Sequence, residues 1–280
     1  MTSFVSALRL PVGPVDLTAI DPAGTPAYDG GKEEAEAALE GLGPELAELQ
    51  ERLYANRAGG RSVLLVLQGM DTSGKGGILE HTVGLVSPAG VKVTSFKAPT
   101  EEERAHDFLW RIEKALAPAG IIGVFDRSQY EDVLIGRVRD LAPADEIERR
   151  YGAINDFEKR IADGGTTIVK CMLHISAAEQ KERLLARLDD PAKHWKFNPG
   201  DIDERARWAS YREAYEIALE RTNTDAAPWY VVPSDHKWYR NLAIGHLLLE
   251  ALRGLDLTWP PADFDVEHEK QRLRDEVPVQ

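Results

Sequence analysis

The feature that most constrains the fold is a glycine-rich loop directly after a short apolar run. The run is Val63–Leu67, and the loop reads Gly69-Met70-Asp71-Thr72-Ser73-Gly74-Lys75-Gly76-Gly77. A glycine, four residues and then Gly-Lys is the spacing of loops that turn backbone N–H groups onto phosphate oxygens. The pattern predicts a strand, a phosphate-binding turn and a helix over residues 78–85. The alternative is a tight strand-to-helix turn without a ligand.

Two residues depart from the common form of this loop. Gly76 follows Lys75, so the usual Ser or Thr hydroxyl that holds Mg²⁺ is missing. Asp71 places a carboxylate where a polyanion would lie, and the two repel each other unless a cation lies between them. We therefore interpret Asp71 as a metal ligand that replaces the hydroxyl, with Lys75 as the mobile cation. The other loop positions are assigned to phosphate binding: Gly69, Met70, Thr72, Ser73, Gly74, Gly76 and Gly77.

Apolar runs alternate with helix-like segments along the rest of the chain. Further strands are predicted at 91–96, 121–125, 166–175 and 229–233. Helices are predicted at 32–57 (with a break near Gly43-Pro44), 101–116, up to 163, 176–188, 201–221 and 237–252. This alternation is typical of an α/β fold in which helices cover both faces of a parallel, five-stranded sheet.

The chain divides into three parts on this basis. Residues 1–58 are expected to form an extended arm and a helix that pack on the core. Residues 59–252 carry the phosphate-loop domain, with a lid at about 183–212. Residues 253–280, which include two consecutive prolines, are expected to hug the surface or to be disordered.

Composition limits the partners and the compartment. The net charge of −13 argues against nucleic acid as a partner. No apolar stretch approaches the length of a membrane span, and the first residues, Met1–Phe4, lack a charged-then-apolar leader pattern. The single cysteine, Cys171, lies in an apolar run, so a buried core thiol is favoured over a reactive one. The chain is expected to be cytoplasmic.

A second acid follows the predicted strand 121–125. Asp126 is expected to share a Mg²⁺ ion with Asp71, because the carboxyl ends of parallel strands meet at one edge of the sheet. The alternative role for Asp126 is an N-cap on the next helix. Arg127 would neutralise charge on a phosphoryl group in transfer.

A nucleotide site is predicted beside these two acids. Lys97, after the second strand, together with Arg127, Tyr130, Glu131 and Arg137, forms the predicted contact set. Tyr130 and Glu131 could equally be structural. Transfer between phosphates needs no strong general base, because the attacking phosphate oxygen is already anionic.

A basic stretch runs from Lys181 to Arg212. Arg183 and Arg187 lie four residues apart and share a helix face, and Lys193 and Lys196 follow on a polar interruption. Such a run is usually a solvated surface. Its place after the fourth strand, however, is that of the mobile lid of small-molecule kinases, where arginines close over phosphate and exclude water.

Together these segments resemble the polyphosphate kinase 2 family. The likeness spans about residues 28–252 and is carried by 67–75, 95–100, 105–111, 125–134, 183–197, 227–233 and 237–243. It implies a three-layer α/β/α sandwich like that of thymidylate kinase, with a helical lid. It also implies a catalytic set comprising Asp71, Lys75, Asp126, Arg127, Arg183 and Arg187, with Lys193 and Lys196 on phosphate.

The resemblance further implies the chemistry and the partners. The reaction would be reversible transfer of the terminal phosphoryl group of inorganic polyphosphate to AMP or ADP, with Mg²⁺ (Mn²⁺ as the substitute metal) and guanine nucleotides as further candidates. Many relatives have Ser-Trp-Tyr-Asn where this chain has Ser128-Gln129-Tyr130-Glu131. This variant is similar to the subgroup that accepts both AMP and ADP. A homodimer or homotetramer is expected. The alternatives are an ATP-dependent kinase of a small acceptor and a non-catalytic phosphate- or nucleotide-binding module.

Overall fold

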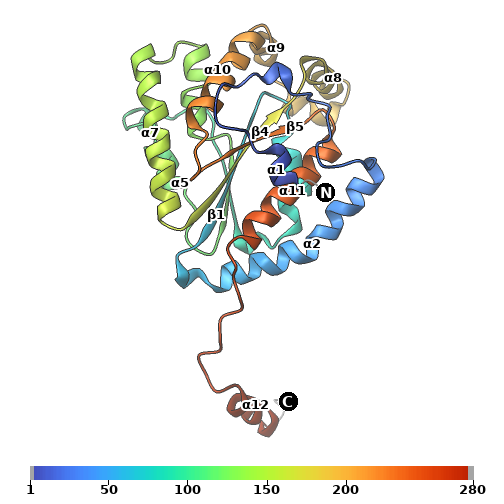
Figure 1. Cartoon of the computed structure of the whole chain (residues 1–280), viewed down its shortest axis with the longest axis vertical. Coiled ribbons are helices and arrows are strands. Elements are labelled where there is room, and N and C mark those ends of the chain that lie inside the picture. The colour runs from blue at the N-terminus through green and yellow to red at the C-terminus, as the bar shows by residue number, and fades with distance from the viewer. Residues whose placement is uncertain (1–2, 277–280) are drawn as a thin grey trace.

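A five-stranded parallel sheet forms the centre of the molecule, which we describe from a computed structural model covering residues 3–276 (Figure 1). The strands are β1 (Ser62–Gly69), β2 (Val91–Ser95), β3 (Ile122–Asp126), β4 (Thr166–His174) and β5 (Trp229–Pro233). Their order in the sheet is β2-β3-β1-β4-β5. All five predicted strands and their parallel arrangement are confirmed. The first two residues of the predicted leader-free N-terminus, and the last four of the C-terminal extension, lie outside the described residues.

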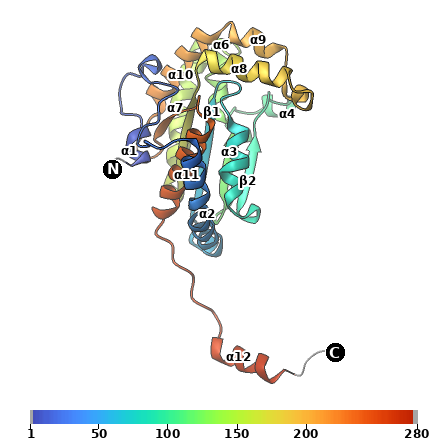
Figure 2. The same cartoon turned by 90° about the vertical axis from the view of Figure 1, so that its right-hand side faces the viewer.

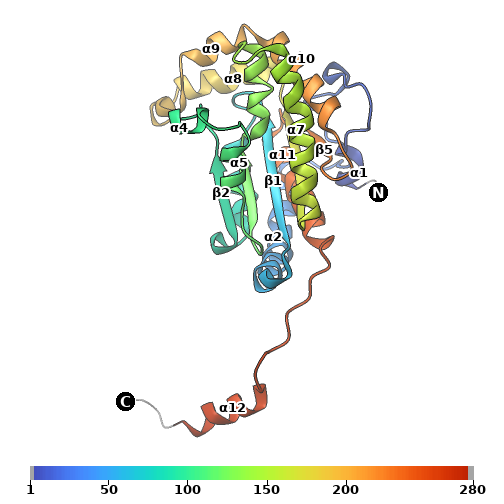
Figure 3. The same cartoon turned by 90° about the vertical axis from the view of Figure 1, so that its left-hand side faces the viewer.

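Helices cover both faces of the sheet and form the outer two layers of the predicted sandwich. On one face lie α1 (Phe4–Leu8), α2 (Lys32–Ala55), α3 (Lys75–His81) and α11 (Lys237–Arg253) (Figure 2). On the other face lie α5 (Trp110–Ala115), α6 (Ile135–Val138), α7 (Ala144–Asp163) and α10 (Trp208–Thr222) (Figure 3). The remaining helices are α4 (Glu101–Arg104), α8 (Ala177–Leu188), α9 (Gly200–Arg205) and α12 (Val266–Asp275).

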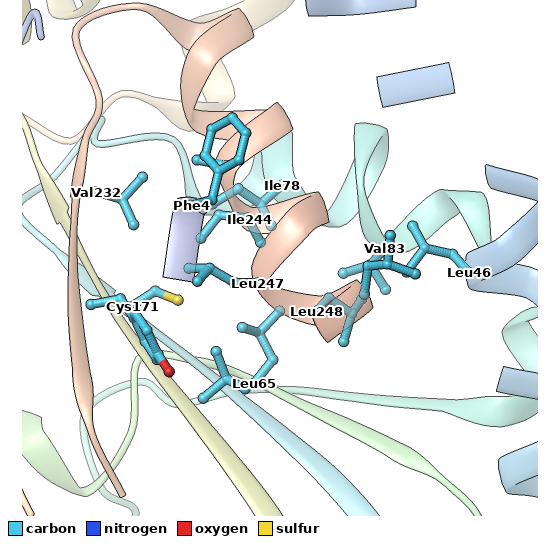
Figure 4. Close-up of a cluster of buried hydrophobic side chains, with 14 of the residues drawn as sticks. Phe4, Leu46, Leu65, Ile78, Val83, Cys171, Val232, Ile244, Leu247 and Leu248 are labelled. Carbon is cyan, nitrogen blue, oxygen red and sulfur yellow. The ribbon is translucent and has the colours of Figure 1, made fainter. Parts of the chain in front are cut away.

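The sheet is buried on both sides because its strand residues alternate between two apolar cores. Leu65 and its neighbours two residues away face α2, α3 and α11, whereas Leu64 and Val66 face α7 and α10. Cys171 lies fully buried in the first core, beside Leu65 and Leu247 (Figure 4). Burial raises the pKa of its thiol. The prediction of a core thiol is confirmed.

The N-terminal segment is more ordered than the expected extended arm. It contains α1, and it pairs with the edge strand β5 through an antiparallel bridge from Arg9 to Tyr230. Phe4 packs into one core and Leu17 into the other. The arm therefore wraps the β5 edge, which closes a strand that would otherwise be free to pair with another chain.

Three helix predictions are wrong in detail. The predicted helix 201–221 is two helices, α9 and α10, separated at residues 206–207. The segment 32–57 does not break at Pro44, because buried leucines on both sides of the proline, Leu39 and Leu46, anchor α2 in the core with α11. The segment 101–116 forms two helices instead of one. Asp107 ends the continuity by accepting the N–H of Leu109 at 3.0 Å, which starts a new turn before α5.

The C-terminal extension lies on the surface only over its first residues, and it contains a further helix, α12. Arg52 of α2 donates to the Leu257 carbonyl at 3.2 Å, and Asn56, just after α2, donates to the Thr258 carbonyl at 2.8 Å. Beyond Pro260-Pro261 the chain leaves the body and ends in α12, which stands well away from the sheet (Figures 1–3). None of the described helices is long and apolar enough to span a bilayer.

Candidate active site

The site forms where the carboxyl ends of β1 and β3 meet. These strands are neighbours, with Leu67 opposite Asp126, and the N–H of Arg127 donates to the Leu67 carbonyl at 3.0 Å. The glycine-rich loop leaves β1 at Gly69, whose φ is +154°. A Cβ there would lie 2.8 Å from the Leu173 carbonyl oxygen of β4, so the turn needs glycine. The sheet order thus brings the two predicted motifs to one edge.

Charged side chains from both motifs meet at this edge. The Nη2 atom of Arg127 lies 2.9 Å from Asp71 Oδ1, and its Nε atom lies 4.0 Å from Glu131 Oε2. Lys75 Nζ donates to the Gly69 carbonyl at 3.0 Å. Burial lowers the pKa of Lys75 and the charge of Arg127 lowers it further, while Asp71, Asp126 and Glu131 oppose the shift. The cluster therefore combines two cations, Lys75 and Arg127, with three nearby acids.

Arg127 holds an uncommon backbone conformation. Its φ is +64°, in the left-handed region that favours glycine, as is that of Thr72 in the loop at +63°. Non-glycine residues in this region gather at functional sites, because the surrounding fold must compensate for the strain. At Arg127 the conformation turns the side chain back from the end of β3 toward Asp71.

The donor set at this edge fits Mg²⁺. Asp71 and Asp126 offer two carboxylates, and within residues 3–276 no group of three His, Cys, Asp or Glu side chains gathers for metal binding. Mg²⁺ is commonly held by one or two carboxylates together with substrate phosphates and water, so two acids suffice. The side-chain hydroxyls of Thr72 and Ser73 are buried without a hydrogen-bond partner among the described residues. Such orphaned donors are what a bound phosphate would satisfy.

A cavity of about 720 Å³ opens beside the acids. This volume lies within the range of small-ligand pockets. Of the predicted nucleotide contacts, Lys97, Arg127 and Glu131 line it. Burial raises the pKa of the Glu131 carboxyl, and the nearby Arg127 and Lys75 counteract the shift.

The cavity has a wall that sequence reasoning missed. Trp208, Tyr211 and Tyr215 of α10 line it, together with Gln180 of α8 and Arg205 of α9. The three aromatic residues recur at a spacing of three and four, which places them on one helix face. That spacing was available in the sequence, but it is equally typical of a helix packed in the core.

Two predicted nucleotide residues are wrong. Tyr130 is fully buried, and its hydroxyl bonds Glu158 at 2.7 Å and Lys170 at 2.8 Å, so no surface remains for a ligand. Arg137 does not line the cavity and points toward α10, with its Nη2 atom 4.0 Å from Glu213. Strand β3 is followed by a tight 3₁₀ turn, which buries Gln129 and Tyr130 in the core and leaves Glu131 partly exposed.

Replacing Tyr130 with phenylalanine should therefore affect stability and leave ligand affinity unchanged. Loss of the hydroxyl leaves buried charged partners short of one bond, which should cost about 1–3 kcal/mol of unfolding free energy. Urea unfolding and ligand titration would measure the two effects. The matched control is Tyr151→Phe on α7, whose buried hydroxyl has no partner among the described residues, so stability should change little. If Tyr130→Phe lost ligand affinity and Tyr151→Phe did not, Tyr130 would belong to the binding site after all.

Arg183 is not free to grip phosphate as the lid interpretation requires. All five of its N–H donors meet protein oxygens: Glu179, the carbonyls of Thr72 and Ser73, and the carbonyls of Ser234 and Asp235. Arg183 therefore holds the backbone of the glycine-rich loop through the Thr72 and Ser73 carbonyls. Arg187 makes none of these loop contacts: it donates to the Lys196 carbonyl at 3.3 Å and lies 4.0 Å from Asp201. Lys193 and Lys196 are exposed on the lid, and their phosphate contacts stay a prediction.

Comparisons with known proteins agree with this geometry. The family model described as "Polyphosphate kinase 2 (PPK2)" matches residues 30–258. An AMP/ADP-polyphosphate phosphotransferase of Meiothermus ruber is 47% identical over 89% of this chain and 93% of that protein. An ADP-polyphosphate phosphotransferase of Rhodopseudomonas palustris is 40% identical over 77% of this chain and 78% of that protein. The crystal structure of polyphosphate kinase 2 from Arthrobacter aurescens TC1 superimposes with a TM-score of 0.95, at 55% identity and 98% coverage of both chains.

Proposed function

This chain belongs to the polyphosphate kinase 2 family, and from that premise we propose that it transfers the terminal phosphoryl group of inorganic polyphosphate to AMP and ADP. One observation carries the proposal. The loop that carries Asp71 and Lys75 leaves β1 beside Asp126, the last residue of the neighbouring β3, and Asp71 lines a cavity of nucleotide size. Relatives with names for this activity cover most of the chain.

Asp71 and Asp126 are the residues that would hold Mg²⁺. The ion, when bound, would lower the negative charge between the two phosphate chains, so that one could approach the other. Lys75 would lie on the moving phosphoryl group, and Arg127 would leave its ion pair with Asp71 to contact the same group. The buried hydroxyls of Thr72 and Ser73 would donate to the phosphate bound in the loop.

The chemical step needs positioning more than proton transfer. An anionic oxygen of the nucleotide's terminal phosphate attacks the terminal phosphorus of polyphosphate. The new O–P bond forms as the phosphoanhydride bond breaks, and the shortened polyphosphate leaves with the electron pair of that bond. No protein base is required, because the attacking phosphate oxygen is already anionic.

The acceptor nucleotide would occupy the 720 Å³ cavity. Glu131 can accept hydrogen bonds from sugar hydroxyls or a base amino group. Lys97, which follows β2, also lines the cavity and offers a cation for a nucleotide phosphate. Trp208 and Tyr211 supply flat apolar surface for a base. Gln129, which differs from the residue found in many relatives, lies buried against Glu158 at 2.9 Å. Its influence on the choice between AMP and ADP would therefore act through the position of Glu131.

The test is an assay without ATP. Incubation with ADP, long-chain polyphosphate and Mg²⁺ should produce ATP, and AMP in place of ADP should produce ADP. Replacing polyphosphate with ATP as the only donor is the control, since an ATP-dependent kinase would need it. A protein that transfers phosphate from ATP to a small acceptor, but never from polyphosphate, would contradict the proposal.

The proposal extends to the protein's cellular compartment and its oligomeric state. We place the protein in the cytoplasm, where adenine nucleotides and Mg²⁺ are abundant, and expect a homodimer or homotetramer. Light scattering after size-exclusion chromatography would measure the assembly, and a monomeric mass at micromolar concentration would contradict it.

A further inference from the structure

Two buried arginines converge beneath the phosphate loop. Arg183 comes from α8 and Arg240 from α11, and both donate to the carbonyl oxygen of Ser73, at 3.3 Å and 3.1 Å. Each side chain is almost fully inaccessible to solvent. Two like charges that share one acceptor repel each other, so the arrangement is costly unless other charges compensate.

Arg183 has that compensation. One of its five bonds goes to the carboxylate of Glu179, at 2.8 Å. Its remaining donors meet backbone carbonyls, which leaves no N–H free. Its charge is thus neutralised inside the protein.

Arg240 lacks such a partner. Apart from Ser73, its acceptor is the neutral amide oxygen Oδ1 of Asn241, which lies 2.8 Å from Nη2 and 3.2 Å from Nε. Within residues 3–276 no acid lies within ion-pair distance of it. Burial, and then the charge of Arg183, lower the pKa of Arg240 to about 9. A buried cation without an anion is unfavourable, so its presence indicates a missing negative charge.

The guanidinium of Arg240 touches the turn that would hold that charge. A Cβ added to Gly74 would overlap Nη1 of Arg240, and one added to Gly77 would lie 2.8 Å from Nη2. Gly74 has a φ of +109°, so this glycine is required both by the backbone and by the arginine against it. The positive charge therefore lies directly against the loop backbone, where water does not screen it.

We propose that Arg240 is a positioning residue for the phosphate chain, holding the phosphate group in the loop by its unneutralised charge without touching it. The identity of that chain as polyphosphate rests on the proposed function. Arg240 also fixes the loop through the Ser73 carbonyl, so its charge and its geometry act on the same turn.

The decisive variant is Asn241→Asp. It would place a carboxylate where the amide oxygen now accepts two bonds from Arg240, which neutralises the arginine and keeps it in place. The KM for polyphosphate should rise about tenfold or more, because an unscreened charge against the loop is cancelled. The KM for ADP and kcat should stay nearly unchanged, since the attraction is equal in the ground and transition states.

A binding measurement without turnover accompanies the kinetics. Inorganic tripolyphosphate with Mg²⁺ and no nucleotide should raise the melting temperature of the wild-type protein. In Asn241→Asp the ligand-free protein should melt higher, because a buried ion pair is completed, while the rise caused by tripolyphosphate should be smaller. A merely structural Arg240 predicts the first effect and not the second.

Two further variants separate charge from shape. Arg240→Lys retains the cation and loses the fork of hydrogen bonds, so its melting temperature should fall while the tripolyphosphate effect largely remains. Gln271→Glu on the distant α12 makes the same change in net charge and should alter neither KM.

The outcomes distinguish the two proposals. Equal tripolyphosphate effects in the wild type and Asn241→Asp, with equal KM values, would overturn the role of Arg240 and leave the function standing. A wild-type protein that binds tripolyphosphate but never transfers phosphate from polyphosphate would end the proposed function, while the comparison of the two proteins would still decide the role of Arg240.

Discussion

Replacing Asp126 with asparagine should lower kcat for ADP phosphorylation by polyphosphate about a thousandfold. The reason is the loss of one of two carboxylates at the end of neighbouring strands, which weakens the hold on Mg²⁺. A metal ion contributes several kcal/mol of transition-state stabilisation to phosphoryl transfer, and about 4 kcal/mol corresponds to this factor. Steady-state rates at rising Mg²⁺ concentrations would measure it, and the variant should need more Mg²⁺ than the wild type.

The substitution Asp126→Asn should not disturb the fold, so a fall in kcat can be assigned to the loss of the carboxylate. Asparagine keeps an oxygen that can accept the Ser95 hydroxyl, now 3.3 Å from Asp126 Oδ2, and the strand backbone is unchanged. The matched control is Asp225→Asn, a fully exposed acid in the loop between α10 and β5 whose loss should leave kcat unaltered. Full turnover of Asp126→Asn at the wild-type Mg²⁺ concentration would remove the metal from the proposed chemistry.

The sequence predicted the sheet and the meeting of the two motifs, because both follow from local rules. Strands with apolar side chains on both faces can only be buried between helices, as Leu64 and Leu65 are. Once β1 and β3 are neighbours, their parallel direction places the loop of Asp71 and the end of the strand at Asp126 on one edge of the sheet. The order of the strands within the sheet was not predicted from the sequence; it is seen only in the structure.

The failures concern side chains whose role depends on tertiary neighbours. Tyr130 and Glu131 are adjacent in sequence and equally polar, yet one lies in the core and the other in the cavity. The difference is made by Lys170 and Glu158, which lie far away along the chain. Lys170 donates to the Tyr130 hydroxyl, and this hydroxyl donates to Glu158. Arg183 and Arg187 likewise share a helix face, but only Arg183 reaches the loop carbonyls. No periodicity in the sequence encodes these partners.

That network links the core to the active-site loop. Lys170, at the centre of β4, and Glu158, on α7, are both inaccessible to solvent and lie 2.6 Å apart. The three donors of Lys170 are satisfied by Glu158, the Tyr130 hydroxyl and the Thr222 carbonyl. Glu158 also accepts Gln129. The network therefore fixes the short turn that carries Glu131 from the core to the cavity.

Replacing Lys170 with methionine should be the most destabilising change that we predict. It leaves the carboxylate of Glu158 buried without its cation, and breaking a buried pair in this way costs about 3–5 kcal/mol. Urea unfolding would measure the loss. Adding Glu158→Gln should restore part of it, because the neutral amide needs no counter-ion. Lys159→Met, which removes an exposed cation of the pair with Asp163 on the same helix, should cost about 0.5 kcal/mol or less. If Lys170→Met and Lys159→Met unfold at the same urea concentration, the buried pair contributes no more to stability than the exposed one.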